Sequence, residues 1–322
     1  MLRSKTSIIL EPDLPFGCTT APEKQLGSLL CSCVSNTTKQ PKSCVILSGV
    51  IKYSFLRIIL LFWICICPIS SFAEAVVLAP DIQRIIQRGK LIVALHQENA
   101  PPFSMLKNGE LTGVDVEIAQ DIATKLQVPL EFNRQAKTYD EVVKFVAQGK
   151  ADIAVSLISS SLHRAKFVLF TKPYLLLQQA LLINRLGLAA LSNQREHQDI
   201  RQVLNQPDVK IGTMRSTAYI DYAHADYPQA TIIAYDSWEQ IITDVKTGKL
   251  LAAFYDEIAI NNWNKFHPED SLFLKTKILT HRYDPLAIVV NQQDPLLLAW
   301  LNLYVSRALL DGYFQALQAK YF

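Results

Sequence analysis

The sequence predicts an α/β fold organised as two similar lobes, each with a mixed sheet. The chain has 322 residues and is 50% hydrophobic, which suffices for a substantial core and more than one folded unit. Apolar runs typical of strands alternate with amphipathic helical patterns beyond residue 80. One stretch of this pattern then recurs later in the chain, which favours two lobes of the same design.

Composition and charge exclude several kinds of partner. Thirty-two basic and 29 acidic residues give a formal charge of +3, and no basic run stands out, so no nucleic acid partner is expected. The six histidines show no metal-binding spacing, and no nucleophile motif occurs. We therefore expect no metal, no cofactor and no catalytic residue.

A secretory signal peptide is predicted over residues 50–73. Basic residues precede an apolar run at 58–70, and Ser71 and Ala73 are the small residues of a cleavage site. A transmembrane anchor is the alternative, but it needs about 20 apolar residues. This run is shorter and is interrupted by Pro68. We expect cleavage and release into the periplasm.

Residues 1–49 do not fit a signal peptide, because the segment before an apolar run is normally short. Our hypothesis is that translation begins at Val50 and that 1–49 is a mis-assigned start; the alternative is an unusually long leader. All six cysteines, at 18, 31, 33, 44, 65 and 67, precede the predicted cleavage site. The exported chain would then contain no disulfide.

The first part of the exported chain reads as strand, helix, strand. Residues 90–95 (KLIVAL) form an apolar run, 114–126 have a helical period, and 129–132 (PLEF) are a second short strand. One face of the helix carries Val114, Ile118, Ile122 and Leu126. This order implies a parallel sheet.

An internal repeat supports the second lobe. The stretch YDEVVKFVAQGKADIAVS (139–156) resembles WEQIITDVKTGKLLAAFY (238–255) in its aromatic residue, helical stretch, Gly-Lys pair and apolar strand. The spacing from Tyr139 to Trp238 is the same as the spacing from Gly149 to Gly248. The alternative is that Gly-Lys merely ends two ordinary helices, since glycine is common there.

Between and after the two copies, four further segments are predicted. Residues 173–185 read as extended chain leaving the first lobe, and 191–208 are polar and helix-prone. Residues 209–214 begin the second lobe, whereas 285–290 return to the first and precede C-terminal helices. Two crossings of the chain would make a hinge of two strands.

The predicted limits follow from these crossings. Lobe 1 would comprise 74–183 and 284–322, and lobe 2 would comprise 184–283.

Five motifs together give a resemblance to a known family. They are GKLIVALHQENAPPFS, NGELTGVDVEIAQDIATKL, GKADIAVSLISSSLHRAKFVLFTKPY, GKLLAAFYDE and DGYFQALQAKYF. Over about residues 80–322 the chain resembles the bacterial extracellular solute-binding proteins of family 3, the polar amino acid receptors of ABC importers. The resemblance implies the type II periplasmic-binding-protein fold, with two lobes joined by a two-strand hinge. It also implies an amino acid-like ligand, an inner-membrane ABC permease as partner, and a monomer.

The serine-rich segment around Arg164 is the first candidate site. If Ser161 caps a short helix beginning near Leu162, hydroxyl groups and free backbone amides lie together at the end of a strand. The guanidinium of Arg164 could then bind a carboxylate in a bidentate manner. The alternative is a surface arginine on an amphipathic turn. The resemblance implies that Arg164 holds the ligand's α-carboxylate and that Ser159 assists.

Further site residues are implied by the resemblance, each with a structural alternative. Asp256 matches the carboxylate that pairs with the α-ammonium, but it could equally cap a helix. Ser216 and Thr217 match carboxylate-binding groups of the second lobe, or they too are caps. Tyr139 matches the aromatic that covers the ligand's side chain, or it is plain core. Ser156 lies at the same strand end.

Two positions bear on ligand charge. Gln97 stands where many family members carry an aspartate, and an amide cannot neutralise a desolvated cationic side chain. A neutral or acidic amino acid is therefore expected rather than a cationic one. Arg215 could bind a second acidic group, or it is a solvated loop residue.

Two other functions stay open on the same fold. One is a periplasmic enzyme similar to cyclohexadienyl dehydratase, with His96, Glu98 or His163 as an acid near the cleft. The other is a ligand-sensing receptor domain for a signalling partner.

Overall fold

The computed structural model describes residues 77–194 and 199–322. The predicted leader (1–49), the signal peptide (50–73) and all six cysteines lie outside the described residues. Within the described ranges, no helix has the length and apolar character needed to cross a bilayer.

The first sheet has five strands in the order β4-β1-β5-β12-β6. Strand β1 runs parallel to β4 and β5, whereas β12 runs antiparallel to β5 and β6, so the sheet is mixed. The strands are β1 (Leu91–His96), β4 (Leu130–Ala136), β5 (Ile153–Ala154), β6 (Val168–Phe170) and β12 (Val289–Asn291). The accompanying helices are α2 (Pro80–Arg88), α3 (Val114–Lys125), α4 (Tyr139–Ala147), α10 (Pro295–Leu310) and α11 (Tyr313–Tyr321), with a hairpin of β2 (Met105–Lys107) and β3 (Glu110–Thr112).

The second sheet is also mixed and has the order β11-β7-β10-β8-β9. Strand β8 is parallel to β9 and β10, and β7 is antiparallel to β10 and β11. The strands are β7 (Leu175–Asn184), β8 (Lys210–Met214), β9 (Thr231–Tyr235), β10 (Ala252–Asp256) and β11 (Leu274–Leu286). The helices are α5 (Arg185–Gln194), α6 (Ile200–Leu204), α7 (Tyr219–Asp226), α8 (Trp238–Lys246) and α9 (Glu257–Phe266), followed by the 3-10 helix η2 (Pro268–Leu272).

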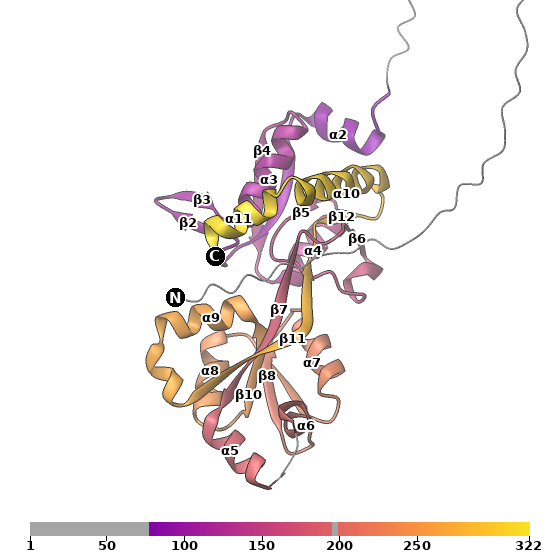
Figure 1. Cartoon of the computed structure of the whole chain (residues 1–322). Coiled ribbons are helices and arrows are strands. Elements are labelled where there is room, and N and C mark those ends of the chain that lie inside the picture. The colour runs from indigo at the N-terminus through magenta and orange to yellow at the C-terminus, as the bar shows by residue number, and fades with distance from the viewer. Residues whose placement is uncertain (1–76, 195–198) are drawn as a thin grey trace, which may run out of the picture. The chain divides into compact units, whose positions relative to one another are not determined.

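The predicted two-strand hinge is formed by β7 and β11. They pair antiparallel from Leu274 opposite Asn184 to Leu286 opposite Leu175, and Figure 1 shows both strands running from one lobe into the other. Their far ends join the first lobe, because Ser159 bridges to Leu286. Both strands therefore belong to the second sheet over all the residues that pair. The exact limits of the two lobes remain a prediction.

Both sheets are covered on two faces. Along β1, Leu91 and Val93 enter one hydrophobic cluster and Ala94 enters another; along β10, Phe254 and Ala253 likewise face opposite clusters. The predicted helical face of α3 is confirmed, since its four apolar residues are all buried in the first cluster. Sheets buried on both faces explain the nearly continuous apolar runs in the sequence.

The internal repeat corresponds to equivalent structural units. Thr138 accepts a hydrogen bond from the Glu141 amide at the start of α4, and Ser237 accepts one from the Gln240 amide at the start of α8. Gly149 and Gly248 follow the two helices with φ of 70° and 78°, a conformation that favours glycine. Each unit then leads to a strand at the centre of its sheet, so the repeat involves more than two helix ends.

The short helix predicted after the serine-rich segment begins two residues later than expected. The helix expected to begin near Leu162 is the three-residue 3-10 helix η1 (Arg164–Lys166). The preceding strand, β5, is only two residues long. Ser161 Oγ still accepts a hydrogen bond from the Arg164 amide at 3.3 Å, but a single turn has little macrodipole.

Candidate functional site

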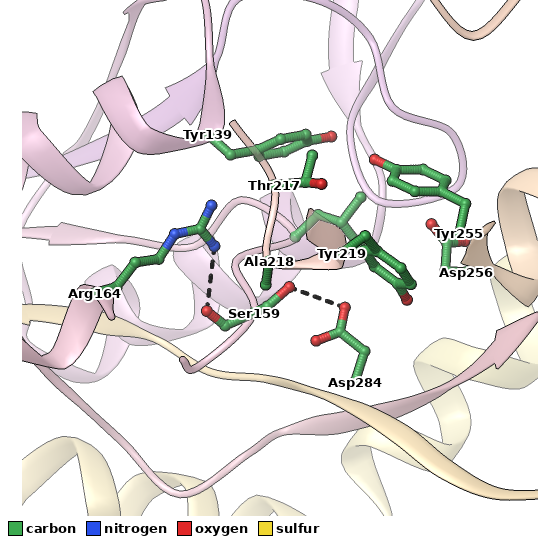
Figure 2. A pocket seen from close by; sticks show the side chains of 10 residues that line it. Tyr139, Ser159, Arg164, Thr217, Ala218, Tyr219, Tyr255, Asp256 and Asp284 are labelled. Carbon is green, nitrogen blue, oxygen red and sulfur yellow. Dashed lines mark hydrogen bonds between the residues drawn. The ribbon is translucent and has the colours of Figure 1, made fainter. Parts of the chain in front are cut away.

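A small polar pocket lies where loops of both lobes meet the hinge. Its volume is about 10 Å³, room for about one water molecule. The lining comes from the start of α4, the segment after β5, the segment after β8, the end of β10, and β11 (Figure 2). The lining residues are Tyr139, Leu157, Ser159, Arg164, Thr217, Ala218, Tyr219, Tyr255, Asp256 and Asp284. A solute larger than a water molecule would fit only after side chains or whole segments moved apart.

Arg164 is a buried member of this lining and is only 4% exposed, so the surface-arginine alternative is wrong. Nη1 donates to the Ser159 carbonyl at 3.3 Å, the bond drawn in Figure 2. Nε and Nη2 donate to Asp140 Oδ1 at 3.1 and 2.9 Å, and Nη2 also donates to the Ser216 carbonyl at 3.2 Å. These four bonds hold the guanidinium in place and leave one of its five N–H groups for a ligand.

The loops that follow β5 and β8 each contain a strained residue. Leu157 and Ser216 have φ of 52° and 58°, a conformation that non-glycine residues adopt at a cost. Asp115 stabilises the first loop, because its Oδ2 accepts a hydrogen bond from the Leu157 amide at 2.6 Å while Oδ1 accepts one from the Tyr174 hydroxyl at 2.7 Å. Burial raises the pKa of Asp115 to about 7. The sequence contains no signal for this positioning role.

Asp256 both caps a helix and lines the pocket. Its Oδ1 accepts a hydrogen bond from the Ala259 amide at 2.7 Å at the start of α9, as the capping alternative predicted. Only 4% of the residue is exposed. Burial, together with the nearby charge of Asp284, raises its pKa to about 7. When ionised, this carboxylate can pair with an ammonium group.

Asp284, which the sequence analysis did not identify, lies in β11 and is 2% exposed. Its Oδ2 accepts a hydrogen bond from the Ser159 hydroxyl at 2.9 Å, shown in Figure 2, and Oδ1 accepts one from the Tyr222 hydroxyl at 3.1 Å. Burial raises its pKa to about 6. A signal did exist, because an aspartate directly before the apolar run 285–290 is an acid at the edge of a predicted buried strand.

Three tyrosines complete the lining. Tyr139 stacks on His96 with ring centroids 4.8 Å apart, and Tyr219 packs against Tyr255 at 4.7 Å. Burial raises the pKa of all three hydroxyls, so they remain protonated at neutral pH. Of the three, sequence reasoning identified only Tyr139, since an aromatic residue in a helix or strand is usually core.

Thr217 and Ser216 take different places. Thr217 lines the pocket, and its hydroxyl donates to the Met214 carbonyl at 2.8 Å. Ser216 lines an adjoining cavity of about 150 Å³ together with Asp140 and Arg164. The two cavities therefore share the guanidinium.

Gln97 and Ser156 do not line either cavity. Gln97 is exposed, and its carbonyl accepts a hydrogen bond from Arg134 Nη2 at 2.7 Å. Ser156 is buried, and its Oγ accepts one from the His96 amide at 2.9 Å, which ties the ends of β1 and β5 together. Arg215 is a solvated loop residue, paired with Asp236 Oδ1 at 2.7 Å. The inference from Gln97 about ligand charge thus does not apply to this pocket.

The three acids considered for an enzyme are poorly placed for catalysis in this pocket. His96 has both ring nitrogens engaged, Nε2 with the Lys137 carbonyl at 2.9 Å and Nδ1 with the Glu98 amide at 3.1 Å. Glu98 and His163 are exposed, and neither lines the small pocket, although His163 lines the adjoining cavity. Within residues 77–194 and 199–322, no group of three histidine, cysteine or acidic side chains is arranged to hold a metal.

Comparison with curated proteins identifies several transport relatives. The chain is 25% identical over 229 residues to ABC transporter arginine-binding protein 1 of Escherichia coli K12, covering 69% of this chain and 86% of that protein. It is also 25% identical over 255 residues to the L-cystine-binding protein TcyJ of the same strain, covering 79% and 89%. A cyclohexadienyl dehydratase of Pseudomonas aeruginosa is 25% identical over 188 residues, covering 58% and 67%.

Solved structures and a family model give the same classification. An ancestral amino acid-binding protein, described as a precursor of cyclohexadienyl dehydratase, is 27% identical, with a TM-score of 0.61 and coverage of 76% of this chain and all of that one. The model of the bacterial extracellular solute-binding proteins, family 3, matches residues 91–322. The two lobes and their two-strand hinge are what the resemblance implied. This chain belongs to the bacterial extracellular solute-binding proteins of family 3.

Proposed function

We propose that this protein binds a free amino acid in the pocket between its lobes and delivers it to an ABC importer. The observation that carries the proposal is that a buried guanidinium, Arg164, and a buried carboxylate, Asp256, line one pocket from different lobes. An α-amino acid has one carboxylate and one ammonium at a fixed separation. Binding it would satisfy both charges and hold the lobes together.

Each side chain then has a chemical role. Arg164 binds the α-carboxylate, and Asp256 accepts hydrogen bonds from the α-ammonium. Ser159 and Thr217 assist once their hydroxyls, which here donate to Asp284 and to the Met214 carbonyl, turn toward the ligand. Tyr139 covers the ligand's side chain. Ser216 contributes from the adjoining cavity through its backbone, whereas Gln97 and Ser156 stay outside the contact set.

Relatives support this assignment. Proteins named for binding arginine, cystine and histidine each match more than two thirds of this chain. These names and the family place the chain among transporter binding proteins rather than enzymes. The dehydratase relative aligns over a shorter stretch and is the second function to test.

Transport also requires a movement and a partner. We infer that lobe 1 (74–183 and 284–322) and lobe 2 (184–283) rotate about β7 and β11, with the ligand stabilising the closed form. The closed monomer would present both lobes to an inner-membrane ABC permease.

Thermal unfolding tests ligand binding directly. At a hundredfold excess over Kd, a bound amino acid should stabilise the fold by about 2.7 kcal/mol, because the ligand binds only the folded form. The measurement is the melting temperature of the purified protein with each common L-amino acid. The matched control is the amine that lacks the α-carboxylate, which should give no shift. If no amino acid raises the melting temperature, the proposal is wrong.

The same protein should bind without turnover. Incubation with prephenate or arogenate should leave the absorbance spectrum of each unchanged, because His96, Glu98 and His163 all lie outside the small pocket and His163 borders only the adjoining cavity. Conversion of either compound at a catalytic rate would instead establish the dehydratase function.

We further propose export through the signal peptide at 50–73. The mature chain should begin near Glu74 and contain no cysteine, since every cysteine precedes that residue. Intact-mass spectrometry of the periplasmic protein, before and after thiol alkylation, measures both properties. A mature mass that includes residues 1–49, or a mass gain on alkylation, would contradict this prediction.

A further inference from the structure

The nine buried aspartates of the described part of the chain fall into two groups. Five are ion-paired with a lysine or arginine: Asp152, Asp226, Asp244, Asp270 and Asp294. The other four have no such pair among the described residues: Asp81, Asp115, Asp256 and Asp284. Only the last two line the pocket. The uncompensated carboxylates that face a cavity are thus both in the proposed binding site.

Asp284 in particular has acceptor capacity to spare. Its two hydrogen bonds come from neutral hydroxyls, those of Ser159 and Tyr222. A carboxylate offers about four acceptor positions, so about two remain. The nearby guanidinium of Arg164 lowers the pKa of Asp284 but is itself bonded to Asp140. Burial of an ionised carboxylate with only neutral partners is costly, and a cationic ligand group would remove that cost.

Charge balance across the pocket leads to the same kind of ligand. The lining contains one positive side chain, Arg164, and two acidic ones, Asp256 and Asp284. With all three ionised, the lining has one net negative charge. A neutral zwitterionic amino acid would leave that charge buried in the closed form. A ligand with one additional positive charge would make the closed complex neutral.

The remaining lining suits a cation as well. Tyr219 is buried against Tyr255, and its hydroxyl makes no hydrogen bond of full geometry in the described part of the chain. It lies near enough to Asp284 to lower the pKa of that carboxyl, so it faces the same space. Figure 2 shows the rings of Tyr139, Tyr219 and Tyr255 around the same space as the two aspartates. Aromatic faces attract ammonium and guanidinium groups, and a tyrosine hydroxyl accepts a hydrogen bond from them.

We propose that Asp284 is a specificity-determining residue that binds a second cationic group of the ligand, so that the preferred ligand is an amino acid with a net charge of +1. This inference rests on the proposed function. It replaces the expectation, drawn from Gln97, that the ligand is neutral or acidic. The acidic side chain that is missing at position 97 is supplied instead by Asp284 of the hinge strand β11. Since Asp284 also bonds to Ser159 of one lobe and Tyr222 of the other, ligand charge would be recognised where the lobes are joined.

Calorimetric titration with matched ligand pairs tests the inference on the unmodified protein. L-Arginine and L-citrulline have nearly the same shape but differ in charge, and L-norleucine is L-lysine without its terminal ammonium group. We expect at least one cationic member to bind about tenfold or more tightly than its neutral counterpart, because the neutral ligand leaves Asp284 unpaired. If the neutral member of both pairs binds as tightly, the inference is wrong while the proposed function survives. If no amino acid binds, both are wrong.

The variant Asp284→Asn then assigns the preference to this residue. It should lose the preference, through about tenfold or greater weakening for the cationic ligand and little change for the neutral one. The control Asp226→Asn alters a buried aspartate that already pairs with Arg201 and Arg282 outside the pocket, and it should keep the preference. A folded Asp284→Asn protein that still prefers the cationic ligand would overturn the assignment. The comparison on the unmodified protein decides the ligand class even if this variant does not fold.

Discussion

Arg164→Met should weaken amino acid binding by about 30-fold or more. Methionine retains much of the apolar stem but removes the guanidinium, so the ligand carboxylate loses its charge-assisted partner. Loss of one member of a desolvated charge pair typically costs about 2 to 5 kcal/mol of binding free energy, and 2 kcal/mol corresponds to about 30-fold. Arg164→Lys should recover only part of the affinity, since an ammonium has three N–H donors and cannot replace four bonds within the protein and one to the ligand. Calorimetric titration with the best ligand from the thermal screen measures both effects.

Two controls make the result specific. Arg215→Met removes an arginine that is exposed and paired with Asp236 outside the pocket, and it should bind like the unmodified protein. Circular dichroism should show that Arg164→Met is folded, although the Ser159 carbonyl loses a donor, at a cost of about 1 to 3 kcal/mol of unfolding free energy. If folded Arg164→Met binds as tightly as the unmodified protein, the guanidinium does not contact the ligand and the amino acid assignment fails.

Asp256→Asn should cause a loss of similar size and also change the pH dependence of binding. Asparagine caps a helix as well as aspartate does, so α9 should remain intact while the negative charge is lost. An ammonium ligand would then lose its ionic partner, at a cost of about 2 to 5 kcal/mol. The exposed residue Asp236, outside the pocket, provides the control Asp236→Asn, which should have no effect.

The pH dependence follows from the pKa of Asp256, which is raised to about 7 in the unliganded fold. Only the ionised carboxylate pairs with the ammonium, so affinity should be highest above pH 7. It should fall as the pH drops, approaching about tenfold per pH unit well below the pKa. Asp256→Asn should remove this contribution and leave the dependence that comes from Asp284, whose pKa is about 6. Titrations between pH 5 and 8 measure both profiles; equal profiles for the two proteins would show that Asp256 is not the titrating group.

Most of the fold is predictable from local patterns. The strand at 90–95, the helix at 114–126 and the strand at 209–214 correspond to β1, α3 and β8 within a residue or two. These elements lie in sheets covered on both faces, so their apolar periodicity is strong. The repeat was also predictable, because a capping residue precedes both α4 and α8, and a glycine with positive φ follows each helix.

The site was only partly predictable. Arg164, Ser159, Thr217, Asp256 and Tyr139 were identified through the resemblance, and all five line the pocket. Sequence reasoning alone could not choose between buried and exposed states of Arg164, since a turn rich in serine is compatible with both. Burial depends on Asp140, Ser159 and Ser216, and Ser216 comes from the other lobe.

The sequence by itself therefore determined the two-lobed α/β architecture and the repeat, because these depend on periodicity and on neighbours close along the chain. Its five motifs also carried the resemblance to the family. Only the tertiary structure decided that Gln97 lies outside the pocket and that Asp284 lies inside it. Asp284 and Ser159 are 125 residues apart, and they meet because β11 returns along the hinge to the loop after β5. The net charge of a buried pocket depends on residues that are far apart in the sequence. Local sequence patterns cannot predict which of these residues lie together in the same low-dielectric pocket.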